Sequence, residues 1–281
     1  MPRILVFHVV MLALGLPVVA QETASQPAAE ASQPVLSPTL DWEEVTLFGA
    51  TKDSIGLAAE GFWRQFTYKS TLATLTSGAG ATWLADHYDD KWLGALRGND
   101  FLTSSFISAL GDETSIALGF SPLVTYLLSR WLEDEKLCHF SVETFGAMLL
   151  TWVETIGLSQ IDYNVRPRDE GEDPATSFFD TAFRGKSSWP SGHLVAPFTL
   201  TFKVWDYYGW KAAILPAGLT VISAGNRIAD GSHYPSDIVA AGFLAFSAHL
   251  ATKKIKTRLD GFHFGAAPLR QGVMLTTGWK F

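Results

Sequence analysis

Apolar stretches of helical length recur along most of this chain, and short polar connections separate them. They are residues 69–86, 102–111, 113–132, 140–158, 194–205, 211–226 and 237–252. The pattern has no clear strand ladder before residue 260. The sequence therefore predicts an all-α fold, a helical bundle with about six core helices.

Two readings of these apolar segments stay open. Charged residues make up only 17% of the chain, which favours a membrane or a large core. A helix that spans a bilayer needs about 20 mainly apolar residues. The longest charge-free runs beyond the N-terminal segment, 70–85, 114–129 and 187–202, are shorter than that. Glu143 and Glu154 within one helix favour a soluble domain attached to a membrane over a protein with six spans.

The two ends of the chain differ in character from its middle. Residues 1–20 have a basic start, an apolar run and a small-residue exit, which predict a signal peptide, although an uncleaved anchor has a similar pattern. Residues 21–40 have the composition of a disordered linker. Residues 259–281 read as a hairpin packed on the bundle, although the terminal Phe281 also resembles the last strand of outer-membrane barrels. The helical domain is then 41–258.

Charge and cysteine content exclude several classes of function. The formal net charge of −7 argues against nucleic acid as a partner. Cys138 is the only cysteine, so neither an internal disulfide nor a cysteine zinc cluster is possible. The run His87–Asp90 has metal-ligand types, but such a run is more often a solvated loop, and we expect no metal site there.

The clearest chemical pattern is Arg227-x5-His233-x3-Asp237. Pro235 fits the first turn of a helix, which places Asp237 in that turn and His233 just outside it. The Asp237 carboxylate can then hold one imidazole nitrogen of His233 and leave the other as a base, ligand or nucleophile. Arg227 adds a planar group suited to an oxyanion. The pattern predicts a nucleophilic histidine beside an anion site.

Two further motifs precede this one, Arg166-Pro167 and Pro190-Ser191-Gly192-His193. Together and in this order, the three motifs resemble the type 2 phosphatidic acid phosphatase superfamily, over roughly residues 110–255. That family includes lipid phosphatases, bacterial acid phosphatases and vanadium haloperoxidases. The resemblance also implies a helical bundle with the active site at one end.

The resemblance implies a role for each motif residue. His233 attacks phosphorus and forms a phosphohistidine, Asp237 holds its imidazole, and His193 protonates the leaving group. Arg166 and Arg227 bind phosphoryl oxygens, and the backbone N–H groups of Ser191 and Gly192 add donors, as does the Ser191 hydroxyl. The scheme needs neither a metal nor another cofactor.

Two positions depart from the family pattern. The family has lysine where this chain has Ser159, and serine where it has Asn226. A charged side chain from the following loop can substitute for the lysine; the candidates are Arg168, Arg184 and Lys186. The loop from Arg168 to Trp189 is expected to border the pocket, with Trp189 either in its wall or in the core. His249, which matches no motif, is interpreted as structural.

These observations predict an extracytoplasmic, metal-independent phosphatase. The expected substrates are phospholipids or polyprenyl phosphates: phosphatidic acid, phosphatidylglycerol phosphate or a polyprenyl pyrophosphate. Membrane association and a site that faces the periplasm are expected with them. Two alternatives remain. Ser159 motivates a relative that binds phosphate or lipid but turns over poorly, and the shared anion site motivates a vanadium haloperoxidase, which the missing lysine disfavours.

Overall fold

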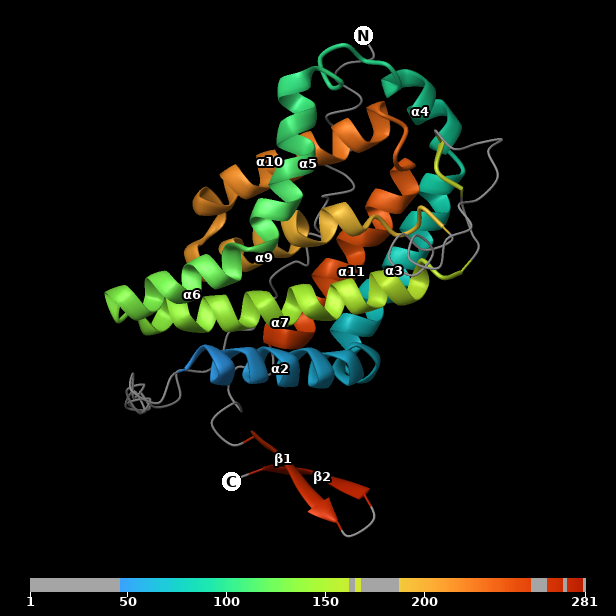
Figure 1. The fold of residues 1–281 in the computed structure, drawn as a ribbon. Coiled ribbons are helices and arrows are strands. Elements are labelled where there is room, and N and C mark those ends of the chain that lie inside the picture. Colours follow the sequence, from blue (N-terminus) through green and yellow to red (C-terminus); the bar gives the residue numbers. More distant parts are fainter. Residues whose placement is uncertain (1–45, 162–164, 168–186, 254–261, 270–271, 280–281) are drawn as a thin grey trace, which may run out of the picture. The chain divides into compact units, whose positions relative to one another are not determined.

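The computed structural model describes residues 46–161, 165–167, 187–253, 262–269 and 272–279. The chain divides into two units, Met1–Thr46 and Leu47–Phe281. The predicted signal peptide and linker therefore lie outside the described residues and stay predictions. Among the described residues of the second unit, every element up to Lys253 is helical, which confirms the predicted all-α class (Figure 1).

The described residues form nine α-helices and one short 3-10 helix, rather than about six helices. They are α2 (Leu47–Thr67), α3 (Lys69–Asp86), α4 (Asp89–Leu96), α5 (Ser105–Gly119), α6 (Ser121–Leu132), α7 (Glu135–Leu158), η2 (Gly192–Leu194), α9 (Val195–Tyr208), α10 (Trp210–Ala229) and α11 (Pro235–Lys253).

Helix α11 occupies the centre of the bundle and contacts α3, α7, α9 and α2 (Figure 1). Its sequence is rich in alanine and it is buried along most of its length, so its neighbours can approach closely. Gly78 of α3 shows how closely, since a Cβ there would lie 2.7 Å from the Cβ of Phe243. Glycine in α3 therefore serves packing between helices, although it lowers helix propensity.

The sequence placed one helix over 113–132, and that prediction was wrong. The helix is broken at Phe120, and Pro122 lies in the first turn of α6, where its missing N–H is tolerated. α7 begins five residues earlier than predicted, because the Asp134 side chain caps it by accepting a hydrogen bond from the Leu137 N–H at 2.9 Å. The segment after Asp41, which has no clear apolar period, contains helix α2.

A buried ion pair joins two core helices at a distance from the motif residues. The Lys203 ammonium of α9 donates to the Glu143 carboxylate of α7 at 3.2 Å and to the Thr252 hydroxyl at 3.0 Å. Both charged side chains are almost fully buried. Glu154, further along α7, is half-buried, and burial raises its pKa to about 7. Neither Glu143 nor Glu154 is therefore an ordinary exposed charge.

Two strands follow the helical part, β1 (Phe262–Leu269) and β2 (Gly272–Trp279), and they pair antiparallel with Phe262 opposite Trp279. Their side chains lie outside the described part of the structure, so packing of this hairpin on the bundle stays a prediction. Among the described helices, α10 has the length and hydropathy of a membrane span, but half of that stretch is buried, as in the core helix of a soluble protein.

Candidate active site

The three motifs meet at one place in the bundle, as the family resemblance implied. Arg227 lies in the last turn of α10, and His233 follows in the link to α11. The backbone N–H groups of Ser232 and His233 both donate to the Arg227 carbonyl at 3.0 Å, which closes this link into a tight turn. η2, which carries His193, contacts α5, α7, α9, α10 and α11 around it.

His233 is held in one orientation by two acceptors. Its Nδ1 lies 3.0 Å from the Ser188 carbonyl oxygen and 3.3 Å from Oδ2 of Asp237. A carbonyl can only accept, so Nδ1 carries the proton and the neutral ring has its lone pair at Nε2. Nε2 is buried and has no hydrogen-bond partner among the described residues. The ring therefore presents an unprotonated, unengaged nitrogen.

Asp237 connects His233 to the start of α11. Its Oδ2 also accepts the Tyr234 N–H at 2.9 Å, the reach-back bond of a capping box, with Pro235 as the first helical residue between them. The Asp237 backbone carbonyl accepts the Ser191 N–H at 3.1 Å. One residue thus fixes the helix start, the imidazole and the Pro190–His193 turn.

His193 faces His233 across the site. The two ring centroids lie 5.7 Å apart at an interplanar angle of 65°, and both residues line the same cavity. His193 is exposed, whereas His233 is 2% exposed. An exposed imidazole beside a buried one suits a proton donor that exchanges with water and a nucleophile that does not.

The two predicted arginines occupy different positions. Arg166 is half-buried and lines the cavity with the two histidines. Arg227 is buried and is not among the residues that line the cavity, and its Nη1 lies 3.8 Å from Oδ2 of Asp230. Burial lowers the Arg227 pKa from its ordinary value, and Asp230 opposes that shift. An arginine pKa starts so high that the guanidinium stays charged.

The expected backbone donors need one correction. The Ser191 N–H already donates to Asp237 and is not available to an oxyanion, because that bond holds the turn against α11. The Ser191 hydroxyl is buried without a hydrogen-bond partner in the described part of the chain. Gly192 lines the cavity, and a Cβ there would lie 3.8 Å from Cγ2 of Thr155.

Thr155 and Asp89 are site residues that the sequence motifs did not reveal. The Thr155 hydroxyl is buried beside the cavity without a partner among the described residues. Asp89 was interpreted as part of a solvated loop, and that was wrong. It is 5% exposed, accepts the Ser236 N–H at 2.9 Å and binds the Ser236 hydroxyl, next to Asp237.

The side chains at the two positions that depart from the family pattern, Ser159 and Asn226, both form hydrogen bonds within the protein. Ser159 caps the end of α7 and lines the cavity, but its hydroxyl donates to the Ile156 carbonyl at 2.9 Å. Asn226 donates to the Leu102 carbonyl at 2.9 Å and to the Ser108 hydroxyl at 3.2 Å, so it ties α10 to α5 and the chain before it. The proposed substitutes Arg168, Arg184 and Lys186 lie outside the described residues.

Three other residues, Trp189, His249 and Cys138, lie outside the lining of the cavity. Trp189 is half-buried and precedes a cis peptide bond to Pro190, and it does not line the cavity. His249 is buried in α11 beside two phenylalanine rings, and burial lowers its pKa well below the usual value. Cys138 is a buried free thiol. Among the described side chains, no group of three or more His, Cys, Asp or Glu is placed to hold a metal ion.

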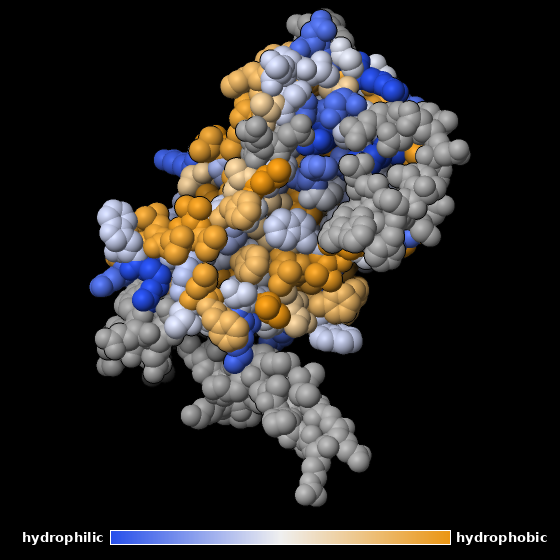
Figure 2. Space-filling view, viewed as in Figure 1, coloured by the Kyte–Doolittle hydropathy of each residue, from blue (hydrophilic) through white to orange (hydrophobic). Residues whose placement is uncertain are grey.

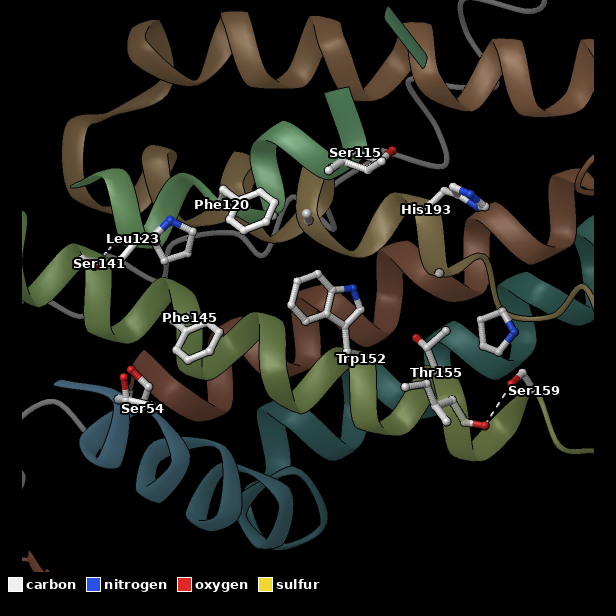
Figure 3. A pocket seen from close by; sticks show the side chains of 18 of the residues that line it. Ser54, Ser115, Phe120, Leu123, Ser141, Phe145, Trp152, Thr155, Ser159 and His193 are labelled. Carbon is white, nitrogen blue, oxygen red and sulfur yellow. Dashed lines mark hydrogen bonds between the residues drawn. The ribbon is translucent and has the colours of Figure 1, made fainter. Parts of the chain in front are cut away.

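The cavity itself has a volume of about 800 Å³ and begins at the two histidines. From the two histidines the cavity continues between α7 on one side and helices α5 and α6 on the other, and it ends at the start of α2 (Figure 3). The end at the two histidines is lined by Arg166, Ser187, Ser188, Gly192, His193 and His233. Apolar side chains dominate the rest, which is the usual character of a site for a small organic ligand.

Comparison with known proteins agrees with the motifs. Searches of the curated proteins and of the solved structures gave no significant match. The family model described as PAP2 superfamily matches residues 162–260. That range contains all seven predicted site residues, from Arg166 to Asp237, together with η2 and helices α9 to α11. This part of the chain, residues 162–260, is therefore similar to the PAP2 superfamily.

Proposed function

We propose that the protein is an extracytoplasmic phosphatase that hydrolyses a lipid-linked phosphate monoester or pyrophosphate through a phosphohistidine. One observation carries the proposal: His233 is oriented by Ser188 and Asp237 so that an unprotonated Nε2 lies beside His193 in a cavity that Arg166 also lines. The superfamily supports the coarser statement, phosphate ester hydrolysis. Export and a periplasmic location rest on the N-terminal sequence alone.

The first step follows from this geometry. Nε2 of His233 attacks phosphorus, the bond from phosphorus to the ester oxygen breaks, and the leaving oxygen takes a proton from His193. The positive charge that develops on the His233 ring is stabilised by the Asp237 carboxylate. Arg166 and the buried Arg227 stabilise the negative charge on the phosphoryl oxygens.

The second step reverses the proton transfer. His193, now neutral, takes a proton from water while the water oxygen attacks phosphorus. The bond between phosphorus and Nε2 breaks, which releases phosphate and returns His233 to its starting state. The exposure of His193 lets water reach it, and the burial of His233 protects the phosphohistidine from other nucleophiles.

The apolar surface of α6 supports the lipid-linked and membrane-associated part of the proposal. Its exposed residues are Leu123, Val124, Leu127, Leu128, Trp131 and Leu132. Figure 2 shows hydrophobic residues gathered over α6 on this face. Contiguous exposed apolar patches on proteins mark membrane or protein contacts. We propose that this surface touches the bilayer from which the substrate comes.

The test is phosphatase activity of the purified chain in EDTA on a water-soluble phosphate ester and on a short-chain phosphatidic acid. We expect hydrolysis by the wild type, none by His233→Ala, and full activity in His139→Ala, which removes a half-exposed histidine of α7. Quenching in alkali should trap a phosphoenzyme in the wild type that His233→Ala lacks. Equal activity of the wild type and His233→Ala would refute the proposal.

A second candidate, a binding protein with weak turnover, is favoured by Ser159. Its hydroxyl is already bonded to Ile156, so it contributes no charge and no ready donor. In Ser159→Lys, a cation would enter the lining at the catalytic end, and we expect at least about tenfold higher kcat/KM if the missing charge limits turnover. A wild type that binds inorganic phosphate but hydrolyses nothing would support the binding role.

A further inference from the structure

Thr155 differs from other buried threonines of this protein in where its hydroxyl goes. A threonine inside a helix commonly donates its hydroxyl to the carbonyl three or four residues earlier. Buried threonines on four of the described helices make this bond over four residues: Thr144, Thr151, Thr201, Thr220 and Thr252. Thr155 is 5% exposed, and its hydroxyl has no hydrogen-bond partner among the described residues. This donor is kept off the helix backbone and is left for another acceptor.

Position at the cavity separates Thr155 from other unpartnered hydroxyls. In the described part of the chain, three further hydroxyls are buried without a partner, those of Ser191, Thr199 and Ser247, and none of these residues lines the cavity. Among the described lining residues, Thr155 and His233 are the two with a buried side-chain N or O atom that has no partner. One is a hydroxyl donor and the other is the lone pair at Nε2. A phosphoryl group satisfies both, because its oxygens accept hydrogen bonds and its phosphorus accepts the lone pair.

The end of α7 is tied to His233 through two adjacent residues. The Ser187 N–H donates to the Ser159 carbonyl at 3.1 Å, and the carbonyl of Ser188 lies 3.0 Å from Nδ1 of His233. Thr155 precedes Ser159 by four residues, so the two lie one turn apart on the same face of α7. The same backbone contacts that orient the histidine therefore bring this face of α7 to it.

Thr155 also packs toward the turn that carries the second histidine. A Cβ at Gly192 would lie 3.8 Å from the Thr155 methyl carbon, and Gly192 directly precedes His193. Figure 3 shows Thr155 extending from α7 on the side where His193 lies. A β-branched side chain has few χ1 rotamers, so packing of its methyl group fixes the direction of its hydroxyl. Thr155 is thus an ordered donor between the end of α7 and this turn.

The neighbouring position explains what this donor replaces. The family pattern has lysine at position 159, where this chain has Ser159. The Ser159 hydroxyl donates to the Ile156 carbonyl at 2.9 Å, so the side chain at 159 supplies neither a charge nor a ready donor. On a helix, side chains four residues apart are neighbours, with about 5–6 Å between their Cβ atoms. The Thr155 hydroxyl therefore lies beside the position from which the lysine of the family pattern would extend.

We propose that the Thr155 hydroxyl binds a phosphoryl oxygen of the substrate and takes, as a neutral donor, the place of the lysine that the family pattern has at position 159. The inference rests on the proposed function, because it places the phosphoryl group at His233. Thr155 is then a catalytic residue. A hydroxyl gives direction but no charge, so its bond to a charged oxygen is weaker than that of an ammonium group.

The first test is a double-mutant cycle between positions 155 and 159, with a water-soluble phosphate ester. Thr155→Val should lower kcat/KM about tenfold, and Thr155→Ser, which keeps a hydroxyl, should restore most of it. In the Ser159→Lys background, Thr155→Val should cost no more than about twofold, because the ammonium binds the same oxygen. Ser159→Met adds length without charge, and in that background the loss should stay at about tenfold. An equal loss in all three backgrounds would show that the hydroxyl and the lysine serve different atoms, and the proposal would fall.

The second test measures binding without turnover, from the rise in Tm that inorganic phosphate causes. Without phosphate, Thr155→Val should unfold at the wild-type temperature or above it, because it removes a buried hydroxyl that has no partner. Thr151→Val, the matched control on α7, should unfold at a lower temperature, because the Thr151 hydroxyl donates to the Ala147 carbonyl at 2.8 Å.

Phosphate should then separate the two variants. Its effect on Tm should be smaller in Thr155→Val than in the wild type, unchanged in Thr151→Val and restored in Thr155→Ser. Each shift is measured against the same variant without phosphate, so that differences in intrinsic stability cancel. A Thr155→Val protein that phosphate stabilises as much as the wild type would overturn the proposal.

Failure of this inference and failure of the proposed function give different results. If the wild type hydrolyses the ester, His233→Ala does not, and Thr155→Val matches the wild type, the phosphatase stands and the Thr155 contact is rejected. If nothing is hydrolysed but Thr155→Val loses the phosphate-induced rise in Tm that Thr151→Val keeps, the phosphatase fails and Thr155 is a ligand of a phosphate-binding protein. A wild type that neither hydrolyses the ester nor responds to phosphate rejects both.

Discussion

The Asp89 carboxylate, at the start of α4, accepts the backbone N–H of Ser236, in the first turn of α11, at 2.9 Å. The Ser236 hydroxyl binds the second carboxylate oxygen. Asp89 therefore caps α11 from another helix, and the residue after Ser236 is Asp237, which holds His233. A side chain far from the motifs in sequence thus holds the helix start that carries Asp237, the partner of His233.

Removal of this cap should loosen the site. We expect Asp89→Ala to lower the free energy of unfolding by about 1 to 2 kcal/mol, as loss of an N-cap does. Asp89→Asn should lower it less, because the amide can accept from the Ser236 N–H and donate to its hydroxyl. Urea unfolding measures both. An activity loss in Asp89→Ala that Asp89→Asn largely restores would mark a positioning role, whereas equal losses would contradict it.

Asp89 should also make stability depend on pH. Burial, with the Asp237 charge nearby, raises its pKa to about 6 from an ordinary value near 3.8. Because the folded protein binds this proton more tightly than the unfolded chain, the contribution of Asp89 to stability falls as pH rises from about 4 to about 6. Asp89→Asn should remove that slope in unfolding curves recorded across this range. An unchanged slope would show that another group causes it.

Asp237→Asn should impair the chemical step without releasing the histidine. The Ser188 carbonyl still holds the proton on Nδ1, so the tautomer of His233 is kept. What is lost is the charge that stabilises the imidazolium, and we expect kcat to fall by about 100-fold. Single-turnover kinetics measure this, with an NMR spectrum of His233 to report the tautomer. A change of tautomer would show that Ser188 alone does not fix it.

Thr155→Val tests a donor that the sequence did not indicate. The substitution keeps the shape of the side chain and removes the hydroxyl, which is buried near Gly192. If that hydroxyl binds a phosphoryl oxygen, kcat/KM should fall by about tenfold, the effect of about 1.4 kcal/mol of lost hydrogen bonding. Thr151→Val is the control, because the Thr151 hydroxyl donates to Ala147 within α7 and does not line the cavity. Equal rates in the two variants would exclude the contact.

The buried pair of Lys203 and Glu143 should be far more costly to break than to replace. Lys203→Met leaves the Glu143 carboxylate buried, and we expect a loss of about 3 to 5 kcal/mol in the free energy of unfolding. The double variant Lys203→Met, Glu143→Leu should recover most of it. Denaturant unfolding of the single and double variants measures the coupling. A double variant no more stable than Lys203→Met would show that other groups hold the lysine.

Much of the fold could be predicted from the sequence, because the signals for helices are local in the chain. The apolar period of 69–86 predicted α3 to the residue, and Pro235 predicted the start of α11. The break at Phe120 was missed, since both sides of it are apolar and the helix period alone does not reveal it. The motif residues could be found because each role depends on residue type and spacing.

Sequence by itself determined the helical class, and it predicted the family resemblance and the candidate residues from Arg166 to Asp237, because helix period and motif spacing are properties of neighbours along the chain. Only the tertiary structure decided what those residues touch. It assigned the Ser191 N–H to Asp237, brought Asp89 and Thr155 to the site, and opened a cavity beside α7. These contacts join residues far apart in sequence, and their geometry depends on how the helices pack, which no local pattern encodes.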